Sequence, residues 1–201
     1  MLDRPDPPLV IVLSGPSGVG KDAVIQRMIE LGHPIRMPVT MTTRPRRSEE
    51  IDGVHYVFVD LAEFERQVEA GELLEHAKVY GNRYGVPRAQ VRAAMATGNH
   101  VLIRVDVQGA ASLRDTLPGA VSIFLVPNDL AHLEAHLRER GSEDAAALRR
   151  RLEQVEAELR EAAYFTHVIE NVEGDLDGTV RAVAAAIRAE AARADRAPIE
   201  V

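Results

Sequence analysis

Short apolar runs alternate along the chain with longer segments in which apolar residues recur at helical spacing. The run at 9–13 (LVIVL) is continuously apolar and of strand length, which is typical of a parallel strand covered on both faces. Similar runs at 101–107 and 121–126 each lead into a segment with helical spacing, as does a last short run at 167–170. A long charged segment at 143–161 also has helical spacing. The alternation predicts a parallel α/β core.

A β-rich stretch at 37–86 interrupts this alternation. Residues 54–59 (VHYVFV) and 73–80 favour strands, and the pair Gly81-Asn82 favours a turn after the second of them. We therefore expect 37–86 to form an insertion in the α/β core.

Composition limits the classes of protein to which the chain can belong. Its 201 residues are enough for one domain with a substantial core, and 46% hydrophobic with 27% charged residues is ordinary for a globular protein. The formal net charge of −7 argues against general binding of nucleic acid. The sequence has no cysteine, no apolar run of membrane-spanning length and no signal-peptide core, so we expect a cytoplasmic protein.

The clearest local motif follows the first apolar run and reads SGPSGVGKD, from 14 to 22. Its glycines allow successive backbone N–H groups to converge on a phosphate, and the N-terminus of the following helix adds a favourable dipole. Lys21 is placed to reach the β- and γ-phosphates of a nucleotide. The usual phosphate-binding loop (P-loop) continues with Ser or Thr, whose hydroxyl binds magnesium, whereas this chain has Asp22.

A second group of candidate residues lies in the β-rich stretch. Arg44 and Arg47 occur in a threonine-rich segment and suit a phosphate dianion, although a basic surface loop would have the same composition. Tyr56 and Tyr84 supply hydroxyl donors or serve only as strand aromatics. Glu75 interrupts an apolar run, which indicates either a buried carboxylate with a binding role or an outward-facing position on the strand.

Taken together, the motifs resemble the guanylate kinase family over about residues 10–190. The segments that carry the resemblance occur in order and are SGPSGVGK, TTRPRR, DGVHYVFV, LLEHAKVYGNRYG, VDVQGA and RERGSE. The GKD form of the P-loop is similar to a bacterial and plastid subgroup. The resemblance implies an α/β P-loop NTPase core, with a parallel sheet flanked by helices, an inserted β-rich GMP-binding subdomain and a helical lid. It divides one domain of 201 residues into core segments 9–36, 88–136 and 164–195, a GMP-binding subdomain 37–87 and a lid 137–163.

The resemblance also implies a reaction and a set of site residues. The family transfers the γ-phosphoryl group of ATP to GMP with Mg²⁺, giving ADP and GDP. The residues implied for ATP are Gly15, Pro16, Ser17, Gly18, Val19, Gly20, Lys21, Asp22 and Asn171. Those implied for GMP are Thr40, Arg44, Arg47, Tyr56, Glu75, Tyr84 and Val86, with Glu75 accepting hydrogen bonds from guanine. The implied catalytic residues are Lys21, Arg44, Arg140 and Arg151, and the candidate Mg²⁺ ligands are Asp22 and Asp106.

Three positions depart from the family pattern. Asp22 replaces the hydroxyl residue of the loop, Arg104 stands where most members have Asp, and Val86 replaces a Ser or Thr that helps to hold guanine. Because a buried guanidinium needs a partner, we expect Arg104 to pair with a carboxylate or a phosphate, and Asp22 is the candidate. These changes leave more of the base selection to Glu75.

Two other functions remain open at this stage. A kinase of ribose 1,5-bisphosphate has a similar loop, but its substrate has no base, so Glu75 and Tyr56 would have no purpose. A catalytically inactive interaction domain shares the fold, but its loop is usually degraded, whereas this chain keeps Lys21 and the three glycines. The expected partners are the nucleotides GMP and ATP, with no nucleic acid or membrane, and the sequence leaves the oligomeric state undetermined.

Overall fold

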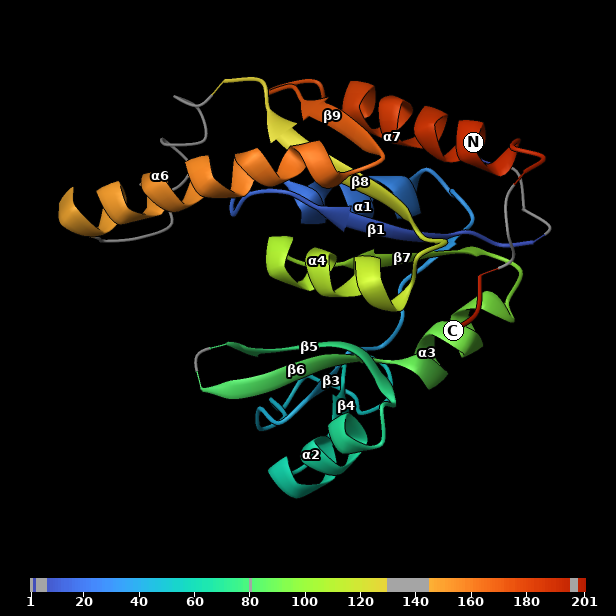
Figure 1. The fold of residues 1–201 in the computed structure, drawn as a ribbon, viewed down its shortest axis with the longest axis vertical. Coiled ribbons are helices and arrows are strands. Elements are labelled where there is room, and N and C mark those ends of the chain that lie inside the picture. The colour runs from blue at the N-terminus through green and yellow to red at the C-terminus, as the bar shows by residue number, and fades with distance from the viewer. Residues whose placement is uncertain (1, 3–6, 80, 130–144, 196–198) are drawn as a thin grey trace.

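A parallel five-stranded sheet forms the core of the protein in a computed structural model, which describes residues 2, 7–79, 81–129, 145–195 and 199–201 (Figure 1). For residues 145–151 only the backbone is described. Every strand pair of this sheet is parallel, which confirms the predicted fold class. In their order across the sheet the strands are β2 (Ile35–Arg36), β7 (His100–Arg104), β1 (Val10–Ser14), β8 (Val121–Pro127) and β9 (His167–Asn171).

Helices cover both faces of the core sheet. Ile11 and Leu13 of β1 pack into one cluster with α1 (Lys21–Glu30) and α7 (Leu176–Ala191). Val10 and Val12 pack into a second cluster with α3 (Arg88–Met95) and α4 (Val107–Thr116). Since alternate side chains of β1 enter different apolar layers, the strand is apolar at every position from Val10 to Leu13.

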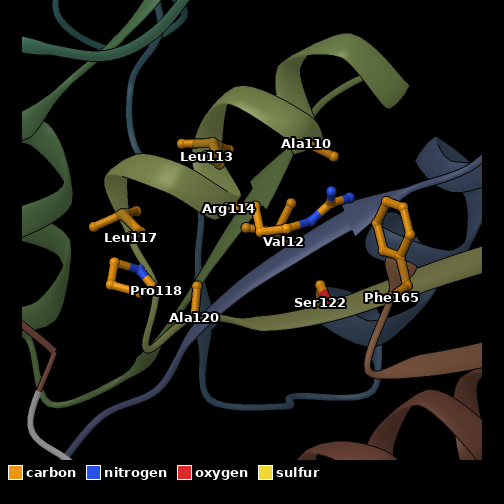
Figure 2. Close-up of a pocket in the computed structure, with 9 residues that line it drawn as sticks. All are labelled: Val12, Ala110, Leu113, Arg114, Leu117, Pro118, Ala120, Ser122 and Phe165. Carbon is orange, nitrogen blue, oxygen red and sulfur yellow. The ribbon is translucent and has the colours of Figure 1, made fainter. Parts of the chain in front are cut away.

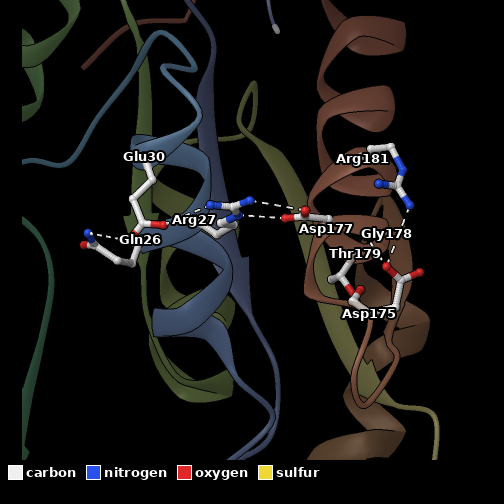
Figure 3. Close-up of polar contacts among 8 residues, drawn as sticks. All are labelled: Gln26, Arg27, Glu30, Asp175, Asp177, Gly178, Thr179 and Arg181. Carbon is white, nitrogen blue, oxygen red and sulfur yellow. Dashed lines mark hydrogen bonds and ion pairs between the residues drawn. The ribbon is translucent and has the colours of Figure 1, made fainter.

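An exposed ion pair joins the helix behind the P-loop to the C-terminal helix (Figure 3). The guanidinium of Arg27 on α1 donates to both carboxylate oxygens of Asp177 on α7, at 2.7 and 3.2 Å, and also pairs with Glu30. Asp175 caps α7 by accepting a hydrogen bond from the Gly178 N–H at 2.9 Å. Because these ion pairs are exposed, they contribute little, and the apolar cluster that α1 and α7 share supplies most of the stabilisation.

The inserted stretch forms a second sheet of four strands, on the other side of α4 from the core sheet (Figure 1). Phe64 of α2 (Leu61–Glu69) fills the apolar cluster under this sheet. In order across the sheet the strands are β4 (Val57–Phe58), β3 (Met41–Thr42), β6 (Asn82–Pro87) and β5 (Leu73–Val79). The turn predicted between β5 and β6 is present, with Gly81 at a positive φ of 84°.

Two predicted strands are shorter in the structure. The strand expected over 54–59 is reduced to β4, because a turn at Gly53 folds the preceding residues, with the Gly53 N–H bonded to the Tyr56 carbonyl at 2.8 Å. The strand expected over 101–107 ends at Arg104, because Asp106 caps α4.

The segment with charged helical spacing contains α6 (Ala145–Arg160), followed by a short 3-10 helix (Glu161–Tyr164). In Figure 1, α6 runs past the end of the core sheet that carries the P-loop. Among the described residues, no helix is long and apolar enough to cross a membrane.

A small cavity lies between α4 and the core sheet (Figure 2). Its volume is about 40 Å³, and its lining is mostly apolar, with Arg114, Ser122 and Phe165 at one side. The guanidinium of Arg114 also stacks over the Tyr164 ring at 5.0 Å. A cavity of this size holds a few water molecules and is far too small for a nucleotide.

Candidate active site

The P-loop leaves β1 and enters α1 in a conformation that requires glycine. Gly15 has a φ of 146°, and a Cβ there would lie 2.5 Å from the Leu125 carbonyl oxygen. Gly20 has a φ of 94°, and a Cβ there would lie 2.5 Å from Nδ2 of Asn171. The N-cap residue of α1 is Gly20, which has no side chain to bond the first N–H groups of the helix, and the helix dipole at this end favours an anion.

Lys21 folds over this loop. Its ammonium donates to the carbonyl oxygens of Gly15 at 2.6 Å and Pro16 at 3.0 Å. Burial lowers the pKa of Lys21, and the nearby carboxylate of Glu158 acts in the opposite direction. The loop and its lysine thus form a partly desolvated cationic cradle, in which a phosphate would be held strongly.

A carboxylate from α6 enters this cradle. The Ser17 N–H of the loop donates to Oε2 of Glu158 at 3.2 Å, and Gln154 donates to Oε1 of Glu158 at 2.8 Å. Glu158 therefore presents an anion to a backbone donor of the P-loop. The sequence analysis missed this residue, because the contact depends on how α6 packs over the loop and has no local sequence signal.

A larger pocket of about 410 Å³ opens between the second sheet and the carboxyl end of β7; we call it the β5–β6 pocket. It contains five of the seven side chains expected at GMP. Its lining residues are Thr40, Tyr56, Glu75, Ala77, Val79, Tyr84, Gly85, Val86, Arg104, Val105 and Asp106. The residues expected at GMP that do not line it are Arg44 and Arg47.

Glu75 faces this pocket from β5 and is only 9% exposed, which settles its orientation in favour of the buried alternative. Burial, together with the negative charge of Asp106, raises the pKa of Glu75 to about 7. The N-terminus of α4 closes in beside it, since a Cβ on Gly109 would lie 3.2 Å from the Glu75 carboxylate. A buried carboxylate in this setting gains stability from any ligand that donates hydrogen bonds to it.

Arg44 lies at the edge of the pocket, held by Glu50. Its guanidinium donates to Glu50 at 2.6 Å and to the Pro45 carbonyl at 2.8 Å, and it stacks 5.4 Å from the ring centre of Tyr56. The hydrogen bonds from Arg44 and from the Arg47 backbone lower the pKa of Glu50 to about 2. Glu50, which the sequence analysis did not single out, thus orients the arginine segment.

The predicted pairing of Asp22 with Arg104 is confirmed. Nη1 of Arg104 lies 3.0 and 3.2 Å from the two carboxylate oxygens of Asp22. The expectation that Arg104 is buried was wrong, because its side chain is 42% exposed at the end of β7. Since Arg104 also lines the β5–β6 pocket, this pair connects the first turn of α1 to the pocket.

The remaining expected site residues have different surroundings. Nδ2 of Asn171 donates to the Val19 carbonyl at 2.7 Å, and Oδ1 of Asn171 accepts from Thr179 at 2.8 Å, so this side chain supports the P-loop. Arg140 and the side chain of Arg151 lie outside the described residues. In the part of the chain that the structure describes, no three His, Cys, Asp or Glu side chains are grouped closely enough to hold a metal ion.

A P-loop on a parallel core sheet, with a second polar pocket near it, defines a P-loop kinase of a small phosphorylated substrate. The sequence profile described as guanylate kinase matches residues 8–190. A guanylate kinase of Symbiobacterium thermophilum is 42% identical over 188 residues, which cover 94% of this chain and 88% of that protein. Guanylate kinase 2, chloroplastic/mitochondrial, of Oryza sativa subsp. japonica is 41% identical over 201 residues, covering 100% of this chain and 70% of that protein.

Comparison of structures agrees with comparison of sequences. The crystal structure of guanylate kinase from Anaplasma phagocytophilum matches with a TM-score of 0.70 and 32% sequence identity, covering 97% of this chain and 91% of that chain. The chain belongs to the guanylate kinase family.

Proposed function

We propose that this protein transfers the γ-phosphoryl group of ATP to GMP, giving ADP and GDP. The observation that carries the proposal is the buried Glu75 carboxylate, which faces a pocket of nucleotide size near the P-loop. Membership of the guanylate kinase family supports it independently.

The ATP side of the proposal uses the P-loop. The loop amides from Gly15 to Gly20 and the ammonium of Lys21 would bind the β- and γ-phosphates. Asn171 would contribute by holding the loop backbone at Val19. No side chain has to act as a nucleophile, because the reaction needs positioning and neutralisation of charge.

The GMP side uses the β5–β6 pocket. Glu75 would accept hydrogen bonds from N1–H and the 2-amino group of guanine, against the apolar wall that Val86 provides. Adenine has an acceptor at N1 and no 2-amino group, so its edge would leave the buried carboxylate unpaired. Thr40, Arg44, Arg47, Tyr56 and Tyr84 would bind the GMP phosphate, once the Arg44 guanidinium turns toward it from Glu50.

We also propose Mg²⁺ as the metal that accompanies ATP. It binds phosphate oxygens together with only one or two protein carboxylates, so a group of three ligands is not needed. Asp22 follows Lys21 directly and fits such a role, with Asp106 as a second candidate. When bound, Mg²⁺ supplies charge neutralisation at the phosphates.

The lid and the location of the protein complete the proposal. We place the GMP-binding subdomain at 37–87 and the lid at 137–163, with Arg140 and Arg151 closing over the transferring group. Closure of such a lid excludes water, which would otherwise accept the phosphoryl group. A cytoplasmic location is consistent with the absence of a membrane-spanning helix among the described residues.

A coupled assay of ADP release tests this function. GMP, AMP and ribose 1,5-bisphosphate are each presented with ATP and Mg²⁺ to the purified protein. We expect ADP release with GMP alone, because the other two substrates cannot donate a pair of hydrogen bonds to Glu75. ADP release with ribose 1,5-bisphosphate and none with GMP would overturn the proposal.

A further inference from the structure

Arg104 is in contact with both halves of the active site. Arg104 is the last residue of β7 and pairs in register with Leu13 of β1. Leu13 lies one residue before β1 ends and the P-loop begins. The guanidinium of Arg104 pairs with Asp22, the second residue of α1, at 3.0 Å. The same residue lines the β5–β6 pocket, so a positive charge stands at the boundary between the two nucleotide sites.

The ion pair that holds Arg104 is easily exchanged for a stronger partner. The side chains of Arg104 and Asp22 are 42% and 78% exposed, and an ion pair open to water contributes little to stability. The contact to Asp22 uses one nitrogen, Nη1, of a guanidinium that carries five N–H donors. A phosphoryl group offers several charged oxygens, which a guanidinium binds through two parallel hydrogen bonds.

Two further cations of the site, Lys21 and Arg44, are engaged in contacts of their own. Lys21 is bonded to the carbonyls of Gly15 and Pro16 within the P-loop. Arg44 is bonded to Glu50, stacks on Tyr56 and is not among the residues that line the pocket. Asp22 and Asp106 also bring negative charge to this region. When two phosphates meet there, a cation at the boundary therefore offsets more electrostatic repulsion.

We propose that Arg104 is a catalytic residue whose guanidinium binds the phosphoryl group in transfer, while Asp22 holds it at the boundary beforehand. In the transfer, an oxygen of the GMP phosphate forms a bond to the γ-phosphorus. The bond from the γ-phosphorus to the bridging oxygen breaks, and ADP leaves with that electron pair. Arg104 stays protonated and offsets the charge on the transferring oxygens. This inference rests on the proposed transfer to GMP and adds a residue to it.

Steady-state kinetics of Arg104 variants test the proposal. We expect Arg104→Ala to lower kcat by about 100-fold and to leave the KM for GMP nearly unchanged, because the contact forms in the transition state. Arg104→Lys keeps the charge without the fork and recovers part of kcat, as does addition of free guanidinium ion to the Arg104→Ala variant. Arg36→Ala is the matched control: it removes an exposed arginine from β2, beside β7, outside the pocket lining.

A second variant tests the role given to Asp22. With Mg²⁺ saturating, so that a change in metal affinity does not enter, Asp22→Asn lowers kcat in the wild-type background, and it has a much smaller effect when Arg104 is already alanine, because the two residues act as one unit in holding the guanidinium. Equal effects in both backgrounds would show that Asp22 acts independently of Arg104 and would overturn this part of the proposal.

Three results would overturn the role of Arg104. The first is a wild-type kcat in Arg104→Ala, and the second is a raised KM for GMP with kcat unchanged, which describes a ground-state contact. The third is a loss of kcat in Arg104→Ala together with a melting temperature lower than that of Arg36→Ala, because the loss would then reflect unfolding. Failure of the proposed function itself is recognised separately, because the wild-type protein would then release no ADP in response to GMP.

Discussion

The carboxylate of Glu75 titrates in an unusual range because of where β5 places it. Burial and the charge of Asp106 raise the pKa of Glu75 to about 7, and only the ionised form can accept two hydrogen bonds from guanine. We therefore expect the KM for GMP to fall as the pH rises through 7, by about tenfold between pH 6 and pH 8. Initial rates across this range measure it.

The control for this experiment is Glu75→Gln, which has no titrating group at this position. We expect the variant to retain only the pH dependence that belongs to the phosphate of GMP itself. A wild-type profile that coincides with that of Glu75→Gln would contradict the role of the carboxylate.

The same raised pKa has a consequence for stability, with the opposite dependence on pH. The folded protein disfavours the charged form of Glu75, so this cost is absent below about pH 4.5 and fully present above about pH 7. Glu75→Gln should raise the free energy of unfolding at pH 8, by at most about 3 kcal/mol, and change it little at pH 4.5. Urea denaturation measures both, with the exposed Glu65→Gln on α2 as control. A variant less stable than wild type at pH 8 would contradict the assignment.

Single residues were predicted well where the chemistry is local. Lys21 and the glycines of the P-loop could be recognised from spacing alone. The pairing of Arg104 with Asp22 was predicted across 82 positions of the chain because a charge that interrupts an apolar strand needs a partner, although Arg104 is not buried. Glu158 and Glu50 could not be found in this way. Glu158 approaches Ser17 from 141 positions along the chain, and Glu50 is one of several acidic residues in an exposed loop.

Helix α6 contacts the P-loop through the side chain of Glu158. Glu158 occupies the Ser17 N–H, a donor that a phosphate oxygen of ATP would otherwise use. We expect Glu158→Gln to lower the KM for ATP, by up to about fivefold, because a competing charge is removed from a partly exposed contact. Glu156→Gln, on the same helix, is the control. An increased KM for ATP in Glu158→Gln, or an equal decrease in both variants, would contradict this expectation.

The main elements of the core could be predicted from the hydrophobic pattern of the sequence, whereas the short strands of the insertion could not. The central strands β1 and β7 are buried on both faces over most of their length and so read as apolar runs in the sequence. β3 and β4 have two residues each, and their limits are set by the turn at Gly53 and by pairing with distant strands. Such pairing leaves no periodic signal over so short a length.

At the scale of the molecule, α4 lies between the two sheets and contacts both of them. It packs on β1 on one side and on β5 on the other (Figure 1). Its N-terminal cap, Asp106, lines the β5–β6 pocket. The core sheet supplies the P-loop at its carboxyl edge, and the insertion supplies the second pocket facing that edge. The fold therefore brings together the P-loop and the β5–β6 pocket, which are the proposed sites of ATP and GMP.

This arrangement predicts that both nucleotides bind head to head, with their phosphates meeting beside Lys21 and Arg104. Isothermal titration calorimetry with adenosine and guanosine joined by a chain of five phosphates tests it most directly. We expect one molecule of the joined ligand per chain and a Kd at least about 100-fold below that of either nucleotide alone, because the second contact becomes intramolecular. Binding no tighter than that of GMP or ATP, or two molecules bound per chain, would contradict the account.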